Sequence, residues 1–244
     1  MKHGSSLIKL FFIFPFLLLI CSCAKDSTDQ KNKKLAQNYY KLCMLEFSDK
    51  SQTSVSSEEP YKKALQYIQQ AIDSYACSEY LAVKATLLFR LNDVASSCKV
   101  FEESLKLDCE PQIKACIMNN YACLLAQIGK HEKALDIFKG LETNNAYLTP
   151  QAALFNRGKI MFEQADYNAA VQEFLKAIQK SPDFLDARYY LAMSAFRMND
   201  LALAKNEVKT ILFLEPGHEG ATWLKNKIDA DLSIDNGLGE DVSC

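Results

Sequence analysis

Two stretches of equal length decide the fold: residues 158–182, GKIMFEQADYNAAVQEFLKAIQKSP, and residues 192–216, AMSAFRMNDLALAKNEVKTILFLEP. Their closing prolines, Pro182 and Pro216, lie 34 residues apart. Each stretch begins on a small residue, carries Asp in its middle and then repeats apolar residues every three or four positions. That spacing predicts the end of one helix, a turn and a second, amphipathic helix. The matched pairs are Gly158 with Ala192, Asp166 with Asp200, Ala170 with Ala204, Phe174 with Val208, and Ala177 with Ile211.

The same pattern continues toward the N-terminus. The small residue at the predicted helix crossing becomes Ala122 in one unit and Ala85 in the unit before it. The turn becomes Gly129 in the first of these and Asn92-Asp93 in the second. The most N-terminal unit is degenerate, because its two predicted helices, residues 35–47 and 61–75, are separated by a long Ser- and Glu-rich loop.

Helical pairs with a 34-residue period are the pattern of the tetratricopeptide repeat. We therefore expect an all-α fold, a superhelix of about five hairpins closed by a capping helix. An irregular helical bundle is the alternative, and four units in register argue against it. The expected boundaries are 33–77, 78–111, 115–148, 151–184 and 185–218 for the units, 219–230 for the cap and 231–244 for a disordered acidic tail.

The first 22 residues predict an export signal. Lys2 and Lys9 precede an unbroken apolar run, residues 10–20, which is too short to span a bilayer. The run leads into Ile20-Cys21-Ser22-Cys23, which resembles the bacterial lipobox and marks Cys23 for acylation with palmitate-like chains. An ordinary signal peptide with two incidental cysteines is the alternative. Residues 23–32 are expected to form a polar tether, and the lack of Asp after Cys23 favours an outer-membrane anchor that faces the periplasm.

The composition argues against catalysis and against nucleic-acid binding. The formal net charge of -2 supplies no basic field to attract nucleic acid. Only His131 and His218 remain after the signal, and no nucleophile elbow, phosphate loop or His-Glu-x-x-His motif occurs. We therefore expect no catalytic residue, no metal site and no cofactor, and a binding protein instead of an enzyme.

The cysteines leave one alternative open. No Cys-x-x-Cys spacing occurs, which argues against a zinc or redox motif. Cys98, on the second helix of one unit, could face Cys123, on the first helix of the next, and an oxidising periplasm permits a disulfide. The alternative, which we favour, is that both are small buried apolar residues.

The first helix of each hairpin is the predicted binding surface, because that helix lines the concave face of such arrays. Aromatic side chains interspersed with Asn, Gln and Arg suit an extended peptide or a partner helix. For the aromatic residues, packing against neighbouring helices is the alternative. The candidate partner-binding residues are Phe89, Arg90, Asn119, Asn120, Gln127, Phe155, Asn156, Lys159, Phe162, Tyr189, Phe196 and Arg197.

Four short motifs carry a family resemblance: Asn119-Asn120-Tyr121, the Gly129-Lys130 turn, Tyr147-Leu148-Thr149-Pro150 and Asn156-Arg157-Gly158. With them, residues 78–228 resemble the type IV pilus biogenesis and stability lipoproteins. The resemblance implies a pilotin-like scaffold that binds an outer-membrane secretin and assists assembly of a secretion or pilus complex. The long loop of the first unit departs from that family. A general adaptor for envelope proteins or cell-wall enzymes is therefore the alternative function.

Overall fold

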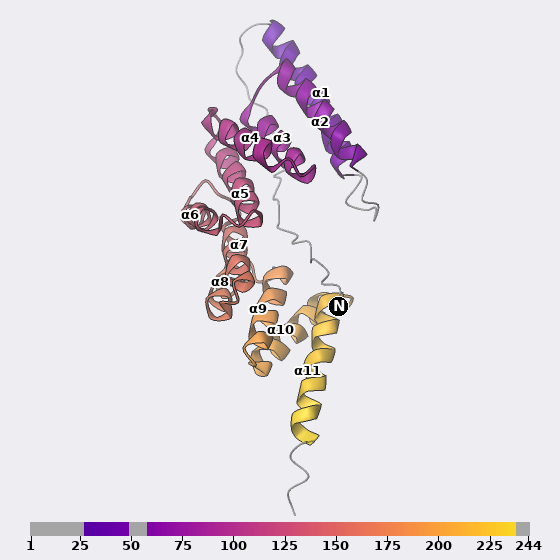
Figure 1. The fold of residues 1–244 in the computed structure, drawn as a ribbon, viewed down its shortest axis with the longest axis vertical. Helices are drawn as coiled ribbons and strands as arrows, with labels where there is room; N and C mark the ends of the chain where they lie inside the picture. The colour runs from indigo at the N-terminus through magenta and orange to yellow at the C-terminus, as the bar shows by residue number, and fades with distance from the viewer. Residues whose placement is uncertain (1–26, 49–57, 238–244) are drawn as a thin grey trace, which may run out of the picture. The chain divides into compact units, whose positions relative to one another are not determined.

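The computed structural model describes residues 27–48 and 58–237, and every element within these ranges is an α-helix. The predicted signal peptide, Cys23 and the last seven residues of the predicted tail lie outside the described residues. The prediction of an all-α fold is confirmed for the described part. Its helices (Figure 1) are α1 (Ser27–Ser48), α2 (Glu59–Ser74), α3 (Ser78–Arg90), α4 (Val94–Lys106), α5 (Pro111–Gln127), α6 (His131–Glu142), α7 (Pro150–Glu163), α8 (Tyr167–Lys180), α9 (Leu185–Arg197), α10 (Leu201–Leu214) and α11 (Glu219–Gly237).

The turns inside the hairpins share one backbone geometry, which explains why the repeat can be recognised from the sequence. The second residue after the first helix takes a left-handed conformation, with φ of 63° at Asn92, 60° at Ala165 and 61° at Asn199. In the fourth such turn Gly129 has φ of 78°. Asn and Gly adopt this conformation most readily, so Ala165 is the unusual residue of the set.

Aspartate then starts the second helix in three of these turns. The carboxylates of Asp93, Asp166 and Asp200 each accept a hydrogen bond from the backbone N–H three residues on, at 3.0–3.1 Å. Such a cap satisfies one of the N–H groups that a helix start leaves unpaired. The motif of a left-handed residue followed by Asp therefore encodes the hairpin locally.

Small residues lie where the two helices of a hairpin cross, as the sequence predicts. A Cβ atom placed on Gly158 would lie 2.6 Å from a ring carbon of Phe174 on α8. In the equivalent places, Ala85, Ala122 and Ala192 are fully buried. Close approach of the backbones at this point lets the large apolar residue of the second helix fill the core of the hairpin.

The helices form two compact units: Met1–Ile137 with Asn145–Tyr147, and Phe138–Asn144 with Leu148–Cys244. In the first unit one core lies among α1, α2 and α3, and a second lies among α3, α4 and α5. In the second unit one core lies among α7, α8 and α9, and another among α9, α10 and α11. Within each unit, apolar faces are thus buried against the next helices along the chain, as expected of a repeat array.

Two predicted boundaries are wrong. Helix α1 begins at Ser27, inside the predicted tether of residues 23–32. That polar stretch holds no Gly or Pro, the two residues that most oppose a helix. Helix α11 continues to Gly237 instead of ending at residue 230 before a disordered tail, because no Gly or Pro interrupts it after Gly220.

Candidate partner-binding surface

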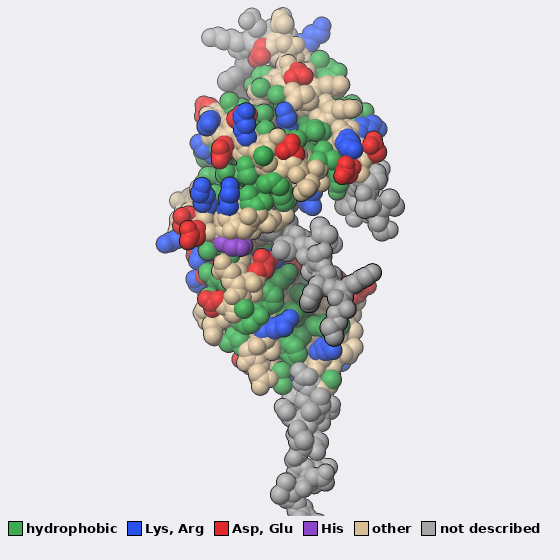
Figure 2. All heavy atoms as spheres, in the orientation of Figure 1, with side chains coloured by type: hydrophobic (Ala, Val, Ile, Leu, Met, Phe, Trp, Pro, Cys, Tyr) green, Lys and Arg blue, Asp and Glu red, His purple; other side chains and the backbone are tan. Residues whose placement is uncertain are grey.

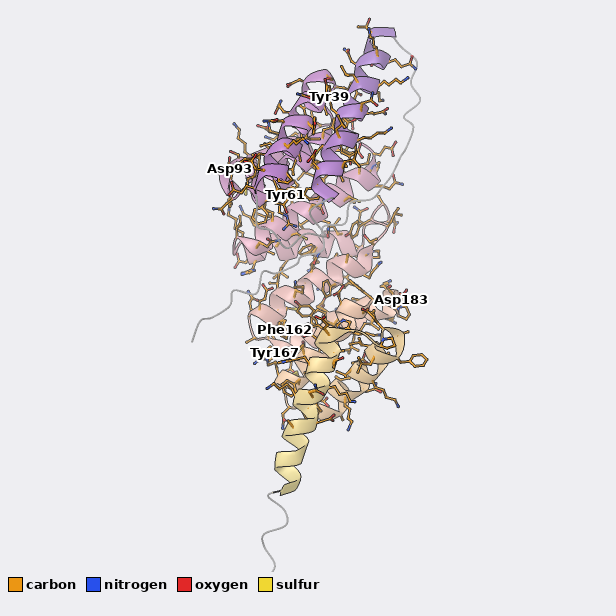
Figure 3. All side chains as sticks on the ribbon, turned by 90° about the vertical axis from the view of Figure 1, so that its right-hand side faces the viewer. Tyr39, Tyr61, Asp93, Phe162, Tyr167 and Asp183 are labelled. Carbon is orange, nitrogen blue, oxygen red and sulfur yellow. The ribbon has the colours of Figure 1, made fainter. Side chains whose placement is uncertain are left out.

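In the second unit, aromatic side chains of α7 and α9 form one cluster around Tyr190. The Tyr190 ring meets Phe162 edge-on at 5.5 Å between centroids and Phe155 at 5.6 Å. Phe162 also meets Tyr167 at 5.4 Å, and Figure 3 shows these two side chains together at the turn between α7 and α8. Such edge-to-face contacts stabilise the arrangement beyond the burial of area alone.

A lysine lies inside this aromatic cluster. The Nζ atom of Lys159 is 5.1 Å from the ring centroid of Tyr190 and 5.8 Å from that of Phe155. Only 3% of Lys159 is exposed. An ammonium group held over two ring faces is attracted by their negative quadrupoles, which helps to compensate its burial. Burial also raises the pKa of the Tyr190 hydroxyl, with Glu163 nearby adding to the effect.

The exposed rim of this cluster lies on α9. Tyr189 packs against Tyr190 at 5.9 Å and against His218 at 5.5 Å, and remains half-buried. Phe196 is likewise half-buried, and Arg197 is exposed. Half-buried rings beside a cationic side chain are able to anchor a peptide, because a partner can cover the remaining apolar area at little cost in side-chain entropy.

Ion pairs tie the second helices of this unit to the first. Arg157 on α7 contacts Glu142 of α6 and, at 3.1 Å, Glu173 of α8. Arg188 on α9 pairs with Glu207 of α10 at 2.7 Å. Because these groups are mostly shielded from water, they position the hairpins more firmly than exposed pairs would.

In the first unit the candidate residues lie on α3 and α5. Phe89 and Gln127 are half-buried and Arg90 is exposed, whereas Asn119 and Asn120 are buried. The Asn119 amide donates to the Asn120 side-chain oxygen at 3.4 Å.

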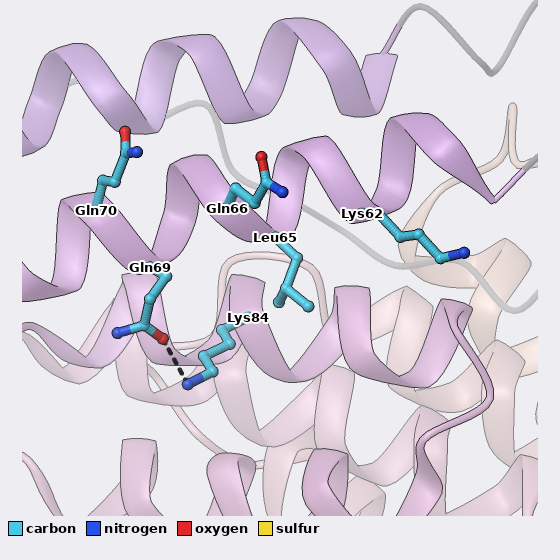
Figure 4. Close-up of a pocket in the computed structure, with 6 residues that line it drawn as sticks. All are labelled: Lys62, Leu65, Gln66, Gln69, Gln70 and Lys84. Carbon is cyan, nitrogen blue, oxygen red and sulfur yellow. Dashed lines mark hydrogen bonds between the residues drawn. The ribbon is translucent and has the colours of Figure 1, made fainter.

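An open hollow of about 700 Å³ lies on the surface of α2 and α3 in the first unit (Figure 4). Lys84 donates to Gln69 across it at 2.7 Å. Sequence reasoning missed this hollow, although the run QYIQQ at 66–70 marks α2 as rich in amide side chains. Its lining residues are Lys62, Leu65, Gln66, Gln69, Gln70 and Lys84.

The structure divides the predicted binding residues by exposure. Phe155 is 1% exposed and packs on Phe174 and Phe184, so for this ring the packing alternative holds. Asn119, Asn120, Asn156 and Lys159 are also buried, and a partner would reach them only after side chains around them move. The candidates whose side chains are exposed or half-buried, and so open to a partner, are Phe89, Arg90, Gln127, Phe162, Tyr189, Phe196 and Arg197. Tyr190, the centre of the cluster, was missed, although it adjoins the predicted Tyr189.

No disulfide joins Cys98 to Cys123 in the part of the chain that the structure describes, which corrects the disulfide hypothesis. Cys123 is fully buried and Cys98 half-buried, as expected of small apolar residues. Burial raises the pKa of the Cys98 thiol, and this lowers its thiolate fraction and its reactivity.

Other features of the described ranges bear on function. No group of three or more His, Cys, Asp or Glu side chains among residues 27–48 and 58–237 is placed to hold a metal ion. None of the helices described is long and apolar enough to cross a bilayer. Basic and acidic side chains are interspersed on the face shown in Figure 2.

Residues 161–225 match the family model described as tetratricopeptide repeat. No curated protein sequence matches the chain significantly. Among solved structures, pilF of Pseudomonas aeruginosa aligns with a TM-score of 0.68 and 12% identity, over 84% of this chain and 88% of that one. PilW, described as a widely conserved type IV pilus biogenesis factor, aligns with a TM-score of 0.57 and 18% identity, over 86% and 96%.

A third similar structure is YrrB, described as a TPR protein with an unusual peptide-binding site. It aligns with a TM-score of 0.53 and 16% identity, over 81% of this chain and 95% of that one. At these identities the likeness establishes the fold. The chain therefore has the tetratricopeptide repeat fold, the architecture of a protein-interaction scaffold, and carries the repeat signature itself in residues 161–225.

Proposed function

We propose that this chain is a lipid-anchored scaffold of the bacterial outer membrane that faces the periplasm and assists assembly or stability of a secretin-type complex, such as that of a type IV pilus. The observation that carries the proposal is the fold shared with pilF and PilW over most of both chains. The lipobox-like sequence ending at Cys23 supports the anchor, because such a cysteine, once acylated, holds a protein at a membrane surface.

The exposed first-helix residues supply the contacts of this scaffold. Phe162, Tyr189 and Phe196 offer half-buried rings, and Arg197 offers a cation beside them. An extended segment or a helix of the secretin would cover the rings and bury apolar area. The ion pairs of Arg157 and Arg188 keep α7 and α9 in place, so little ordering is required on binding.

The second candidate is a general adaptor that binds peptides of several envelope proteins. The observation that favours it is the similar fold of YrrB, whose description names a peptide-binding site. Both functions use the same aromatic surface, and they differ in the partner.

Co-purification separates the two functions. The full chain is extracted in mild detergent from the bacterium that produces it, after brief cross-linking, and its partners are identified by mass spectrometry. The scaffold proposal predicts recovery of a secretin and loss of heat-resistant secretin multimers when the chain is deleted. Recovery of cell-wall enzymes with unchanged secretin multimers would favour the general adaptor.

A pair of variants locates the binding surface. Phe162→Ala with Phe196→Ala removes two half-buried rings of the first helices, and we expect partner recovery to fall at least tenfold, because central aromatic anchors contribute about 2 kcal/mol or more each. Phe213→Ala is the matched control, since this ring lies on α10 and is 84% exposed. Equal recovery with all variants would move the binding surface away from α7 and α9.

A further inference from the structure

Helix α1 has two different faces. Its inner face packs on α2 and α3 through buried Ala36 and Cys43, with Tyr40 and Phe47 partly buried beside them. In Figure 1, α1 lies alongside α2 at the N-terminal end of the array. The outer face carries three exposed leucines, Leu35 at 44%, Leu42 at 41% and Leu45 at 64%.

The outer face is also cationic. Lys31, Lys34 and Lys41 are exposed, and together with the three leucines they recur at spacings of three, four and seven residues, which places all six residues along one side of the helix. Of the two carboxylates of α1, Glu46 borders this face but is bound to Lys63 of α2, and Asp29 falls on the opposite side of the helix. We call these six residues the basic-apolar stripe.

A stripe of this chemistry fits the surface of an anionic bilayer. The leucines would insert at the boundary between the lipid head groups and the acyl chains, and the lysines beside them would contact the lipid phosphates. The only carboxylate of α1 near the stripe is Glu46, and it is paired with Lys63, so the three lysines keep a net positive charge that suits anionic lipid. The helix cannot cross the bilayer, so it would lie on the bilayer surface.

The position of α1 in the chain supports this occupant. The apolar run of residues 10–20 ends seven residues before Ser27, and Cys23 precedes Ser27 by four. At about 3.5 Å per residue, α1 starts within about 25 Å of the bilayer, whichever of the two holds the chain there. We propose that the basic-apolar stripe of α1 docks on anionic lipid and so orients the array at the membrane.

The proposal rests on the membrane anchor of the proposed function for the position of α1, but it is tested without the lipid anchor or any protein partner. A chain that begins at Ala24 keeps every described helix. Its binding to vesicles of phosphatidylethanolamine and phosphatidylglycerol, three to one, is compared by co-sedimentation with binding to phosphatidylcholine vesicles. We expect binding to the anionic vesicles only, and its loss at 0.5 M NaCl because salt screens the lysines.

Substitutions within the stripe give the size of each contribution. Lys31→Gln, Lys34→Gln and Lys41→Gln together should lower the partition coefficient about a hundredfold, at about fivefold for each lysine. Leu42→Gln should lower it about tenfold. The control for the lysines is Lys205→Gln with Lys209→Gln on α10, and the control for Leu42 is Leu175→Gln on α8, where the leucine is 42% exposed. Both control variants should bind the vesicles as the parent does.

Circular dichroism melts verify that each variant is folded. Equal loss of binding in the stripe variants and in the controls would overturn the proposal, as would absence of binding that depends on phosphatidylglycerol. Light scattering tests a second copy of the chain as the occupant. If the parent is a dimer that Leu42→Gln dissociates while vesicle binding is absent, the stripe is a self-association surface and the proposal fails.

Discussion

Hairpins of the two units share one backbone conformation but differ in the polar contacts that join their two helices. These hairpins are α3–α4 in the first unit and α7–α8 and α9–α10 in the second. Fifteen residues after the crossing residue, α8 and α10 carry the buried carboxylates Glu173 and Glu207, each paired with an arginine of the first helix. At the same place α4 carries Val100. In α3–α4 the interhelical polar contacts come from hydroxyls instead: Ser97 donates to the carbonyl of Ala85 at 2.7 Å and Ser104 to that of Ser78 at 2.8 Å.

This difference shows which features the fold requires and which it tolerates. The left-handed turn and the small crossing residue recur in both units because the backbone path depends on them. The polar contact varies, because an ion pair in one hairpin and a hydroxyl bond in another can each join the two helices. The second unit, which carries the aromatic cluster, uses the charged connection.

The largest effect should follow from breaking one ion pair. Arg188→Met leaves Glu207 buried without its cation, and we expect the free energy of unfolding to fall by about 3 kcal/mol. Arg188→Met with Glu207→Val copies the apolar solution of α4 and should lie within about 1 kcal/mol of the parent. Urea denaturation followed by circular dichroism measures both. Equal destabilisation by the single and double variants would mean that packing, and not charge, explains the effect.

The crossing residue should come next. Gly158→Ala forces a Cβ against the Phe174 ring, and we expect a loss of about 2 kcal/mol in the same urea measurement. Gly140→Ala on α6 is the matched control, because nothing lies within 4 Å of its added Cβ. A helix gains about 1 kcal/mol when Gly becomes Ala, so the two variants should shift stability in opposite directions. A shift of the same sign would contradict the crossing geometry.

The hydroxyl contact of the first unit should contribute less. Ser97→Ala introduces the residue that the other hairpins have there, and it should cost about 1 kcal/mol through the lost hydrogen bond. Thr210→Ala is the control, because it removes an exposed hydroxyl that donates to the Asn206 carbonyl of the same helix. Thermal denaturation should show no fall in the melting temperature of this variant. Should Ser97→Ala leave the melting temperature unchanged, the hydroxyl bond contributes nothing to the hairpin.

The smallest effect concerns the left-handed turn. Ala165→Gly removes the conformational cost of φ 60° and should stabilise the chain by about 0.5 kcal/mol, whereas Gly129→Ala should destabilise it by about 1 kcal/mol. Differential scanning calorimetry resolves both shifts. A loss of stability with Ala165→Gly would indicate that the Ala165 methyl makes contacts which outweigh its backbone strain.

The sequence predicts the hairpins because their determinants are local. Asp166 and Asp200 mark the turns, and Gly158 and Ala192 mark the crossings, so the helix pairs can be assigned from spacing alone. Burial of Phe155 and Lys159 was not predictable in this way, because it depends on Tyr190 and Phe184 of the next hairpin. Periodicity places a residue on a face of its helix but does not say which neighbouring side chain covers it.

The early start of α1 and the length of α11 escaped prediction for a different reason. Polar residues without Gly or Pro are compatible with both a tether and an exposed helix, and amphipathic patterning distinguishes them poorly. The exposed stripe of α1 became recognisable only when Ala36 and Cys43 were seen to face α2 and α3, which assigned Leu35 and Leu42 to the outer face.

Site-specific photo-cross-linking in living cells tests the central claim, that the first helices of the array hold an outer-membrane secretin. Benzoylphenylalanine replaces Phe196 on α9 in one strain and Phe213 on α10 in another, so that each exchange keeps an aromatic ring. We expect a secretin adduct from position 196 and none from position 213. Adducts of equal yield from both positions, or no secretin adduct from position 196 in cells that assemble secretin rings, would contradict it.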